Sequence, residues 1–281
     1  MNLFIPCTVQ ILVRNGGEGL KRCLQTLGDF DEVIVHDGYS TDGTRELASS
    51  FPNVRILDQD RQFLEPDGRI KDFAAIRNQC IAAAKHDWVL VVDADEEVVP
   101  AMVEEVRGIV EADKPSVFQA FRRFFVDGEP VMFAAGYPVY QIRLFHRSQV
   151  EGYVKPVHER LNLQPGVVMH TLRAELPVPL PPASTLKPKY DRYLRMEVRR
   201  TGVMGYGRWF KWVLLRNLRT IVGLSIRIIS QRLSFTPGRR MPFSHEFAFL
   251  RHAFKTIVAT FPPRAARSLK KEAMVAQTSS T

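Results

Sequence analysis

Residues 89–97 of this chain read VLVVDADEE. The four apolar residues are mostly β-branched and form a run too short for a helix, which is typical of a strand buried on both faces. The run ends in Asp93-Ala94-Asp95. Because side chains two positions apart on a strand point the same way, the two carboxylates can face one common site.

This acidic strand end has two interpretations. Two carboxylates at the end of a buried strand are costly unless a cation or ligand compensates them. Their hard oxygens suit Mg²⁺ or Mn²⁺, ions that usually sit on phosphates. Alternatively, the stretch is a strand-to-helix connection in which Asp95 or Glu96 caps a helix near Pro100. The tripeptide alone leaves both open.

The flanking sequence predicts strands that alternate with helices. Strands are expected at 8–13, 33–35 and 54–57, and a helix with an Ala-rich face at about 72–85. This alternation indicates right-handed crossovers and a parallel sheet, whose ligands bind outside the carboxyl ends of the strands. Asp37 follows the second strand, so it should share that edge with the acidic strand end. Its other interpretation is a turn former.

The pattern changes after a predicted helix at 101–112. Residues 117–126 are rich in Phe, Asp127-Gly128 is a hairpin signal, and 139–145 alternates as a strand does. These segments predict antiparallel additions to the sheet. Five prolines within 175–189 then predict a stiff linker.

The predicted organisation has four parts. They are an α/β domain over 1–175 (with a first half to about 97 and a second half over 98–175), a Pro-rich linker over 176–189, amphipathic helices over 190–263, and a disordered tail over 264–281.

The length of 281 residues allows one large α/β domain with an appendage. Its three cysteines, Cys7, Cys23 and Cys80, lack metal-type spacing and fit a reducing compartment. We expect no signal peptide, because no basic region precedes the first apolar residues and Pro6 ends them. No uncharged apolar run approaches the roughly 20 residues of a membrane span.

The formal charge of +9 is unevenly distributed. Residues 187–281 carry 20 Lys and Arg against 4 Asp and Glu, a charge of +16, whereas residues 1–186 carry −7. A basic tail of this kind suits nucleic acid, an anionic membrane or a solvated face.

The pattern of apolar and basic residues in 208–233 distinguishes among these partners. At helical spacing they place one apolar face opposite one basic face, with Trp209 and Trp212 near one end, which is typical of a helix in a membrane interface. A nucleic-acid tail would have fewer long aliphatic side chains. The alternative is a helix packed on the α/β domain. The expected apolar face comprises Phe210, Val213, Leu214, Leu218, Ile221, Leu224 and Ile228. The basic face comprises Arg208, Lys211, Arg216, Arg219 and Arg227.

Several motifs in order carry a family resemblance. They are VIVHDGYSTDGT at 33–44, DFAAIRN at 72–78, DWVLVVDADE at 87–96, RLF at 143–145 and VHE at 157–159. Together they resemble a family 2 glycosyltransferase, of the branch similar to lipopolysaccharide-core β-glycosyltransferases, over about residues 7–200. The resemblance implies an α/β fold of GT-A type: a doubly wound mixed sheet flanked by helices, here with a C-terminal basic amphipathic helical extension.

The resemblance also implies roles for particular residues. Asp37 would hold the nucleotide base or ribose of the sugar donor, and Arg77 and Asn78 would lie along the donor. Asp93 and Asp95 would be the DXD motif, which contacts ribose and a divalent metal. Further implied residues are Glu159 as the catalytic acidic residue and His170 as a completing metal ligand. Relatives often carry Asn-Glu-Glu after the first strand, where this chain has Asn15-Gly16-Gly17-Glu18.

The implied chemistry suits these residue types. Mg²⁺ or Mn²⁺ neutralises the departing diphosphate as a Lewis acid, and a general base deprotonates the acceptor hydroxyl. Glu159 is the expected base, with a salt bridge to Arg160 or Arg143 as its alternative, and His158 is the weaker candidate. His170 could equally be a hydrogen-bonded, half-buried histidine.

The expected function is metal-dependent, inverting sugar transfer from a nucleotide sugar to a lipid-linked or cell-envelope glycan. The expected location is peripheral, on an anionic membrane at the cytoplasmic face of the inner membrane. The rival functions are a nucleotidyltransferase on a similar sheet and a non-catalytic, membrane-bound glycan-binding protein.

Overall fold

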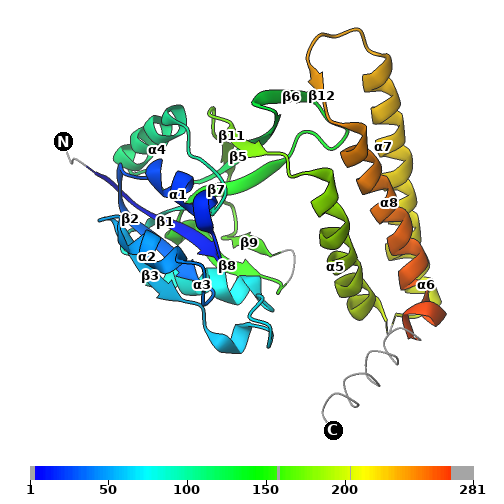
Figure 1. Cartoon of the computed structure of the whole chain (residues 1–281), viewed down its shortest axis with the longest axis horizontal. Helices are drawn as coiled ribbons and strands as arrows, with labels where there is room; N and C mark the ends of the chain where they lie inside the picture. Colours follow the sequence, from blue (N-terminus) through cyan, green and yellow to red (C-terminus); the bar gives the residue numbers. More distant parts are fainter. Residues whose placement is uncertain (1–3, 157–158, 203, 267–281) are drawn as a thin grey trace. The chain divides into compact units, whose positions relative to one another are not determined.

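The computed structural model of the chain describes residues 4–156, 159–202 and 204–266. These residues form two compact units (Figure 1). The sheet unit comprises Met1–Phe124 and Pro138–Pro179, and the helical unit comprises Phe125–Tyr137 and Leu180–Thr281.

The sheet unit alternates strands and helices as predicted. Its parallel strands are β1 (Ile5–Val13), β2 (Phe30–Asp37), β3 (Val54–Asp58) and β4 (Trp88–Asp93). Its helices are α1 (Gly17–Gln25), α2 (Thr44–Ser49), α3 (Phe73–Ala83) and α4 (Pro100–Ala112), with two 3₁₀ turns, η1 (Arg61–Phe63) and η2 (Arg147–Gln149). Later strands are β5 (Val117–Val126), β7 (Tyr140–His146), β8 (Val150–Val154), β9 (Arg160–Leu163), β10 (Met169–Thr171) and β11 (Leu176–Pro179).

The sheet is mixed. Within this unit the strand order is β5-β7-β4-β1-β2-β3, and β10 and β11 also pair with β5. Strands β4, β1, β2 and β3 run parallel, whereas β7 is antiparallel to both β4 and β5. Strands β8 and β9 form a separate two-stranded sheet. The predicted parallel sheet with antiparallel additions is therefore confirmed.

Strand β4 is buried on both faces, as its apolar run predicts. Leu90 and Val92 pack in a core with α1 and α4, while Val89 and Val91 belong to a second core with Phe145 of β7. Burying each such side chain contributes roughly 1.5–3 kcal/mol, so this strand is a firm platform for the residues that follow it.

The acidic residues that follow β4 do not cap the next helix, α4. Helix α4 begins at Pro100, its N-cap position is Val99, and no side chain caps it. The alternative in which Asp95 or Glu96 caps this helix is therefore wrong. Proline at the first helical position has no N–H to satisfy, and its fixed φ suits the start of a helix.

The helical unit contains a small strand group and a set of helices. Strand β6 (Glu129–Phe133) pairs with the end of β5 and with β12 (Arg239–Arg240). The helices are α5 (Ala183–Thr201), α6 (Tyr206–Trp209), the π-helical segment η3 (Phe210–Leu214), α7 (Leu215–Leu233) and α8 (Phe243–Thr260). Helix α8 packs against both α5 and α7 (Figure 1).

The structure divides the chain differently from the predicted boundaries. Residues 176–189, predicted as a linker, contribute β11 and the first turns of α5. The hairpin residues Phe125–Tyr137 belong to the helical unit. Of the predicted disordered tail, residues 267–281 lie outside the described residues.

Candidate functional site

Three acidic residues lie at the carboxyl ends of neighbouring strands. The register pairs Asp37 of β2 with Val13 of β1 and with Asp58 of β3, and it pairs Asp93 of β4 with Leu12 of β1. Asp37, Asp58 and Asp93 therefore share one edge of the sheet, here called the acidic edge. The prediction that Asp37 and the end of β4 lie at the same edge is confirmed.

Arginine side chains surround the carboxylate of Asp93. Its oxygens lie 3.2 Å from Arg143 Nη2, 3.7 Å from Arg77 Nη2 and 3.8 Å from Arg122 Nη2. Arg143 is only 1% exposed and also donates to Glu96 at 2.6 Å, and Arg122 donates to the same Glu96 oxygen at 3.1 Å. The end of β4 is therefore close to charge balance rather than strongly acidic.

The pKa values follow from this arrangement. Burial raises the pKa of Asp93, but the guanidinium groups of Arg143, Arg77 and Arg122 outweigh burial and hold the pKa at about 2. Burial of Glu96 raises its pKa to about 7, and the charge of Asp93 adds to that rise. Asp93 is therefore ionised at neutral pH, whereas Glu96 binds a proton more readily than an ordinary glutamate does.

Replacing Arg143 by methionine should lower the free energy of unfolding by about 3–5 kcal/mol. The change keeps most of the side-chain volume but leaves the carboxylates of Glu96 and Asp93 with one less cation in a buried cluster. Urea denaturation measures the loss. Arg147→Met is the matched control, because Arg147 pairs with exposed Asp87 and should cost about 1 kcal/mol or less. Equal losses in the two variants would contradict a supporting role for Arg143.

Arg77 connects the acidic edge to Glu159. It lies on α3, is 7% exposed, and donates from Nε to Glu159 at 3.0 Å. Its guanidinium also lies over the ring of Tyr153, 5.5 Å from the centroid. The predicted alternative partners of Glu159 were Arg160 and Arg143, but the partner in the structure is Arg77. Glu159 and Asp93 therefore contact the same arginine side chain, that of Arg77.

Asn78, the next residue on α3, supports the same region. Its side chain donates to the Tyr153 carbonyl at 2.9 Å and accepts from the Tyr153 amide at 2.7 Å. A Cβ at Gly152 would come within 2.9 Å of Asn78 Oδ1, so glycine permits this close approach. Both ends of the Asn78 amide therefore hold β8 in place, and the role of Asn78 along the donor stays a prediction.

Asp37 organises the loop that follows β2. It is fully buried, and it accepts hydrogen bonds from the Ser40 amide at 3.1 Å and from Arg45 Nη1 at 3.0 Å. Residue Tyr39 between them has a φ of 59°, a strained value for a residue with a side chain. Asp37 thus acts as a turn former here, and it fixes where the Tyr39 ring points.

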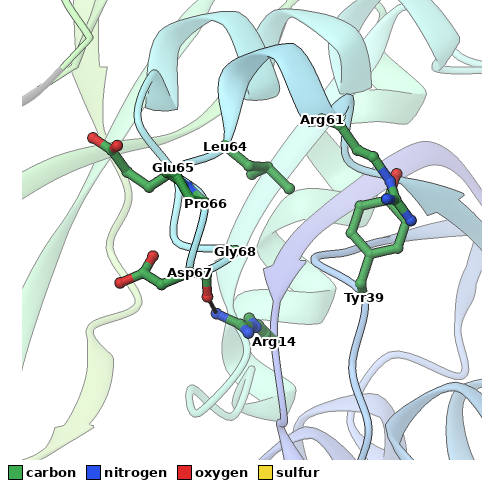
Figure 2. A pocket seen from close by; sticks show the side chains of 8 residues that line it. All are labelled: Arg14, Tyr39, Arg61, Leu64, Glu65, Pro66, Asp67 and Gly68. Atoms are coloured by element: carbon green, nitrogen blue, oxygen red, sulfur yellow. Dashed lines mark hydrogen bonds between the residues drawn. The ribbon is translucent and has the colours of Figure 1, made fainter. Parts of the chain in front are cut away.

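That ring lines an open pocket beside the acidic edge (Figure 2). The guanidinium of Arg61 stacks on Tyr39 at 4.4 Å, and Arg14 Nη1 donates to the Asp67 carbonyl at 2.7 Å. A side chain at Gly68 would clash with the Arg14 guanidinium, because its Cβ would lie 2.9 Å away. The pocket has a volume of about 500 Å³ and is lined by Arg14, Tyr39, Arg61, Leu64, Glu65, Pro66, Asp67 and Gly68.

His170 does not join the acidic edge. It pairs with Phe118 of β5, which pairs with Leu144 of β7, which pairs with Leu90 of β4. His170 is therefore about three strand spacings from β4, roughly 14 Å, and level with a residue three positions before Asp93. Its ring lies 5.3 Å from that of Phe118. The structure thus separates His170 from the predicted metal ligands, and His158 lies outside the described residues.

The remaining acidic residues fit a divalent ion only in part. Among the residues that the structure describes, no group of three or more His, Cys, Asp or Glu side chains is arranged to hold a metal ion. Asp95 is exposed next to Asp93, whose carboxylate already faces three arginines. Magnesium-type ions are commonly held by one or two carboxylates together with substrate phosphates. The donor set fits an ion that arrives with a diphosphate.

The predicted membrane residues differ in their surroundings. Trp209 is buried and donates from Nε1 to Thr260 at 3.2 Å, whereas Trp212 is exposed. Leu214 and Ile221 are half-buried, and Arg216 and Arg219 are exposed. Part of the predicted apolar face therefore packs inside the helical unit.

The sequence interpretation missed several residues of the site. Each follows or lies within a strand, and a signal was available: Arg14 and Arg61 come just after predicted strands, and Arg143 interrupts the alternation of its strand with a charge. A charged residue at a position that should be buried indicates a buried partner. Those not predicted at all as site residues are Arg14, Tyr39, Arg61 and Arg122. Glu96 was considered only as a helix cap, and Arg143 only as a partner of Glu159.

Comparison with known proteins identifies relatives of part of this chain. A TPR repeat-containing protein of Synechococcus elongatus is 33% identical over 151 residues, 53% of this chain and 34% of that protein. The glycosyltransferase SunS of Bacillus subtilis is 36% identical over 90 residues, 31% and 19% of the two chains. An uncharacterized glycosyltransferase of Escherichia coli, YibD, is 30% identical over 128 residues, 42% and 34%. The matches span about a third or less of the length of these relatives.

Solved structures give a weaker likeness. Staphylococcus aureus TarS in complex with UDP has a TM-score of 0.45 at 13% identity, over 95% of this chain and 91% of that one. The mannosyltransferase PcManGT of Pyrobaculum calidifontis, in complex with GDP-Man and Mn²⁺, has a TM-score of 0.46 at 16% identity, over 98% and 81%. The family model named Glycosyl transferase family 2 matches residues 8–161, more than half of the chain. The chain belongs to glycosyl transferase family 2.

Proposed function

We propose that this chain is a metal-dependent, inverting glycosyltransferase that moves a sugar from a nucleotide-sugar donor to a lipid-linked or cell-envelope glycan. The observation that carries the proposal is the contact of Arg77 with both Asp93 and Glu159. It joins the acidic strand end, suited to a diphosphate and its metal, to a second carboxylate suited to an acceptor. Family membership supports the reaction class.

The donor is proposed to lie along the acidic edge. The pocket of Arg14, Tyr39 and Arg61 supports binding of the nucleoside, because a planar base stacks on an aromatic ring or a guanidinium plane. The diphosphate would then reach the end of β4. The side chains of Arg77 and Arg122 bring positive charge to that end, which favours an anionic group there.

The metal would be held by Asp95, assisted by Asp93 and by the donor diphosphate. When bound, it supplies Lewis-acid stabilisation of the departing diphosphate. The residues of the chain orient the donor: Arg143 and Glu96 hold Asp93 in one position, and Asn78 fixes β8 beside it. Glu159 is proposed to take the proton of the acceptor hydroxyl as that oxygen attacks the anomeric carbon. One displacement inverts the anomeric centre.

The acceptor and location rest on further features of the chain. The motif resemblance to the lipopolysaccharide-core branch supports a cell-envelope acceptor, and the basic C-terminal residues support a peripheral position on the cytoplasmic face of the inner membrane. Cys7, Cys23 and Cys80 are free and buried, as in a reducing compartment. Over the described ranges, no helix has both the length and the apolarity to cross a bilayer.

Thermal unfolding against a panel of nucleotide sugars, with and without Mn²⁺, tests the donor assignment. At 100 times its Kd, a cognate donor adds about 2.7 kcal/mol and should raise the Tm by about 5–10 °C, only with the metal present. If no nucleotide sugar raises the Tm in any condition, donor binding is excluded and a glycan-binding role is favoured. Turnover of nucleoside triphosphates with pyrophosphate release would instead indicate a nucleotidyltransferase.

Replacing Tyr39 by alanine should weaken binding of the cognate nucleoside diphosphate about 5- to 150-fold. The reason is that stacking on an aromatic side chain contributes roughly 1–3 kcal/mol per base. Calorimetry with UDP and GDP in the presence of Mn²⁺ measures the change. Tyr206→Ala, at an exposed tyrosine of the helical unit, is the control and should leave the affinity unchanged. An unaltered affinity in Tyr39→Ala would place the base elsewhere.

A further inference from the structure

The helical unit exposes many large apolar side chains. On α7 these are Leu218, Val222, Ile226, Ile229 and Leu233, and on α8 they include Phe243, Phe247 and Phe254. These eight residues are here called the apolar face. Val222 is 57% exposed, Ile226 61% and Phe254 61%. Extended apolar patches of this kind are uncommon on soluble surfaces and mark interaction sites.

Helix α7 is apolar on two sides. Val213 in the preceding η3 and Ile228 are buried within the helical unit, and Asn217 is buried with them. The exposed residues Val222, Ile226 and Ile229 recur at spacings of three and four, so they form one stripe. Packing inside the unit therefore accounts for one apolar side of this helix and leaves the other uncovered. The two interpretations of the sequence, a packed helix and a surface helix, apply to different sides of one helix.

The stripes of α7 and α8 both face away from α5. Glu197 of α5 lines one groove with Thr220 and Leu224 of α7 and Phe249 of α8. At 3.6 residues per turn, Val222 lies roughly 160° from both Thr220 and Leu224.

On α8, Phe247 and Phe254 lie roughly 140–160° from Phe249, whose ring contacts Tyr190 of α5 at 5.8 Å. Helix α7 packs directly on α8, and each stripe lies on the side of its own helix opposite the groove that Glu197 of α5 lines.

Basic side chains accompany this surface. Lys211, Arg219 and Arg251 are exposed, and α7 contains no acidic residue from Leu215 to Leu233. Arg219 follows Leu218 on the edge of the stripe, and Arg251 lies one turn from Phe247 and Phe254 on α8. Exposed Trp212 precedes the stripe, in the position of an interfacial aromatic residue.

The charge selects the occupant of the apolar face. A second copy of this chain would bring the same basic rim against its own, which costs free energy. A bilayer with acidic headgroups matches both features of this face. Its hydrocarbon interior suits the apolar side chains, and its anionic headgroups suit the basic residues beside them.

We propose that the apolar face enters the interfacial layer of an anionic membrane, with its basic rim on the lipid headgroups. This deepens the peripheral membrane position proposed above, and it does not depend on the transfer reaction. The face differs from the one predicted from the sequence: Leu214 and Ile221 are half-buried, whereas Val222, Ile226 and the α8 phenylalanines are exposed.

Flotation of the full chain with phosphatidylcholine vesicles, with and without 30% phosphatidylglycerol, tests the proposal. The chain should float only with the anionic vesicles, and binding should fall as salt rises. Ile226→Glu should reduce the partition coefficient at least about tenfold more than Thr220→Glu. Both variants add one negative charge to an exposed position of α7, so the difference isolates the apolar contact.

The remaining results either support or overturn the proposal. Phe247→Ser, a second variant on α8, should also weaken binding without altering net charge. Absence of binding to anionic vesicles at low salt, or equal losses in Ile226→Glu and Thr220→Glu, would overturn it. A dimer in sedimentation equilibrium that Ile226→Glu dissociates would identify a second copy as the occupant. Because no donor or acceptor is present, none of these outcomes depends on transferase activity.

Discussion

Replacing Asp95 by alanine should abolish the metal-dependent binding of a nucleoside diphosphate. Asp93 already faces three guanidinium groups, so its carboxylate is shared among cations, while Asp95 is exposed beside it. An ion carried by the donor diphosphate therefore depends chiefly on Asp95 for its protein ligand. Without that ligand, Mn²⁺ should no longer increase the affinity for UDP or GDP.

The measurement is calorimetric titration of UDP and GDP with Mn²⁺ and with EDTA. Glu97→Ala is the matched control: it removes an exposed carboxylate two positions away that pairs with Arg22 rather than with the acidic edge. Affinity should fall to the EDTA value in Asp95→Ala and stay normal in Glu97→Ala. Metal-dependent affinity that survives in Asp95→Ala would remove Asp95 from the metal site.

The free protein should have a low affinity for the metal ion in the absence of nucleotide. Since the arginines around Asp93 and Glu96 balance the acidic charge, Mn²⁺ without nucleotide should bind only weakly. This distinguishes the arrangement from a preformed cage of carboxylates and histidines, which would bind the ion by itself. Direct titration of Mn²⁺ into the free protein measures the difference.

Much of the sheet unit could be predicted because its signals are local. The run at Val89–Val92 specifies a strand buried on both faces, and alternation with helices specifies the parallel pairing that brings Asp37 and Asp93 to one edge. Such inferences need only periodicity and chain order.

The partners of the site residues could not be predicted because they depend on strand register. Arg143 reaches Asp93 and Glu96 only because β7 pairs antiparallel with β4, with Leu144 opposite Leu90. A different pairing would have turned the same arginine elsewhere. The same dependence separates His170 from the acidic edge, since β10 joins the sheet beyond β5.

The exposed side of α7 could not be predicted either, because it depends on how the helix packs. Periodicity identified an apolar face, but the helix carries apolar residues on more than one side, and only packing decides which side is covered. Val213 and Ile228 are buried, while Val222 and Ile226 remain exposed.

Replacing Glu159 by glutamine should lower the rate of sugar transfer about 10²- to 10⁴-fold, the usual contribution of a positioned general base. Glutamine keeps the shape and an acceptor oxygen for Arg77 Nε, which now lies 3.0 Å from the Glu159 carboxylate. It cannot take a proton from the acceptor hydroxyl. Donor binding should be nearly unchanged, because the pocket of Tyr39 and Arg61 and the ligand Asp95 are retained.

Steady-state kinetics with the donor identified by thermal unfolding separates these effects. The turnover number should fall in Glu159→Gln while the KM for the donor stays near normal. Glu151→Gln is the matched control, since Glu151 is an exposed carboxylate on the adjacent strand β8. Replacement of His158 should cost less than replacement of Glu159. Near-normal transfer with poor donor binding in Glu159→Gln would reverse the assignment: the Arg77–Glu159 pair would then serve the donor, and His158 would become the residue to test as the base.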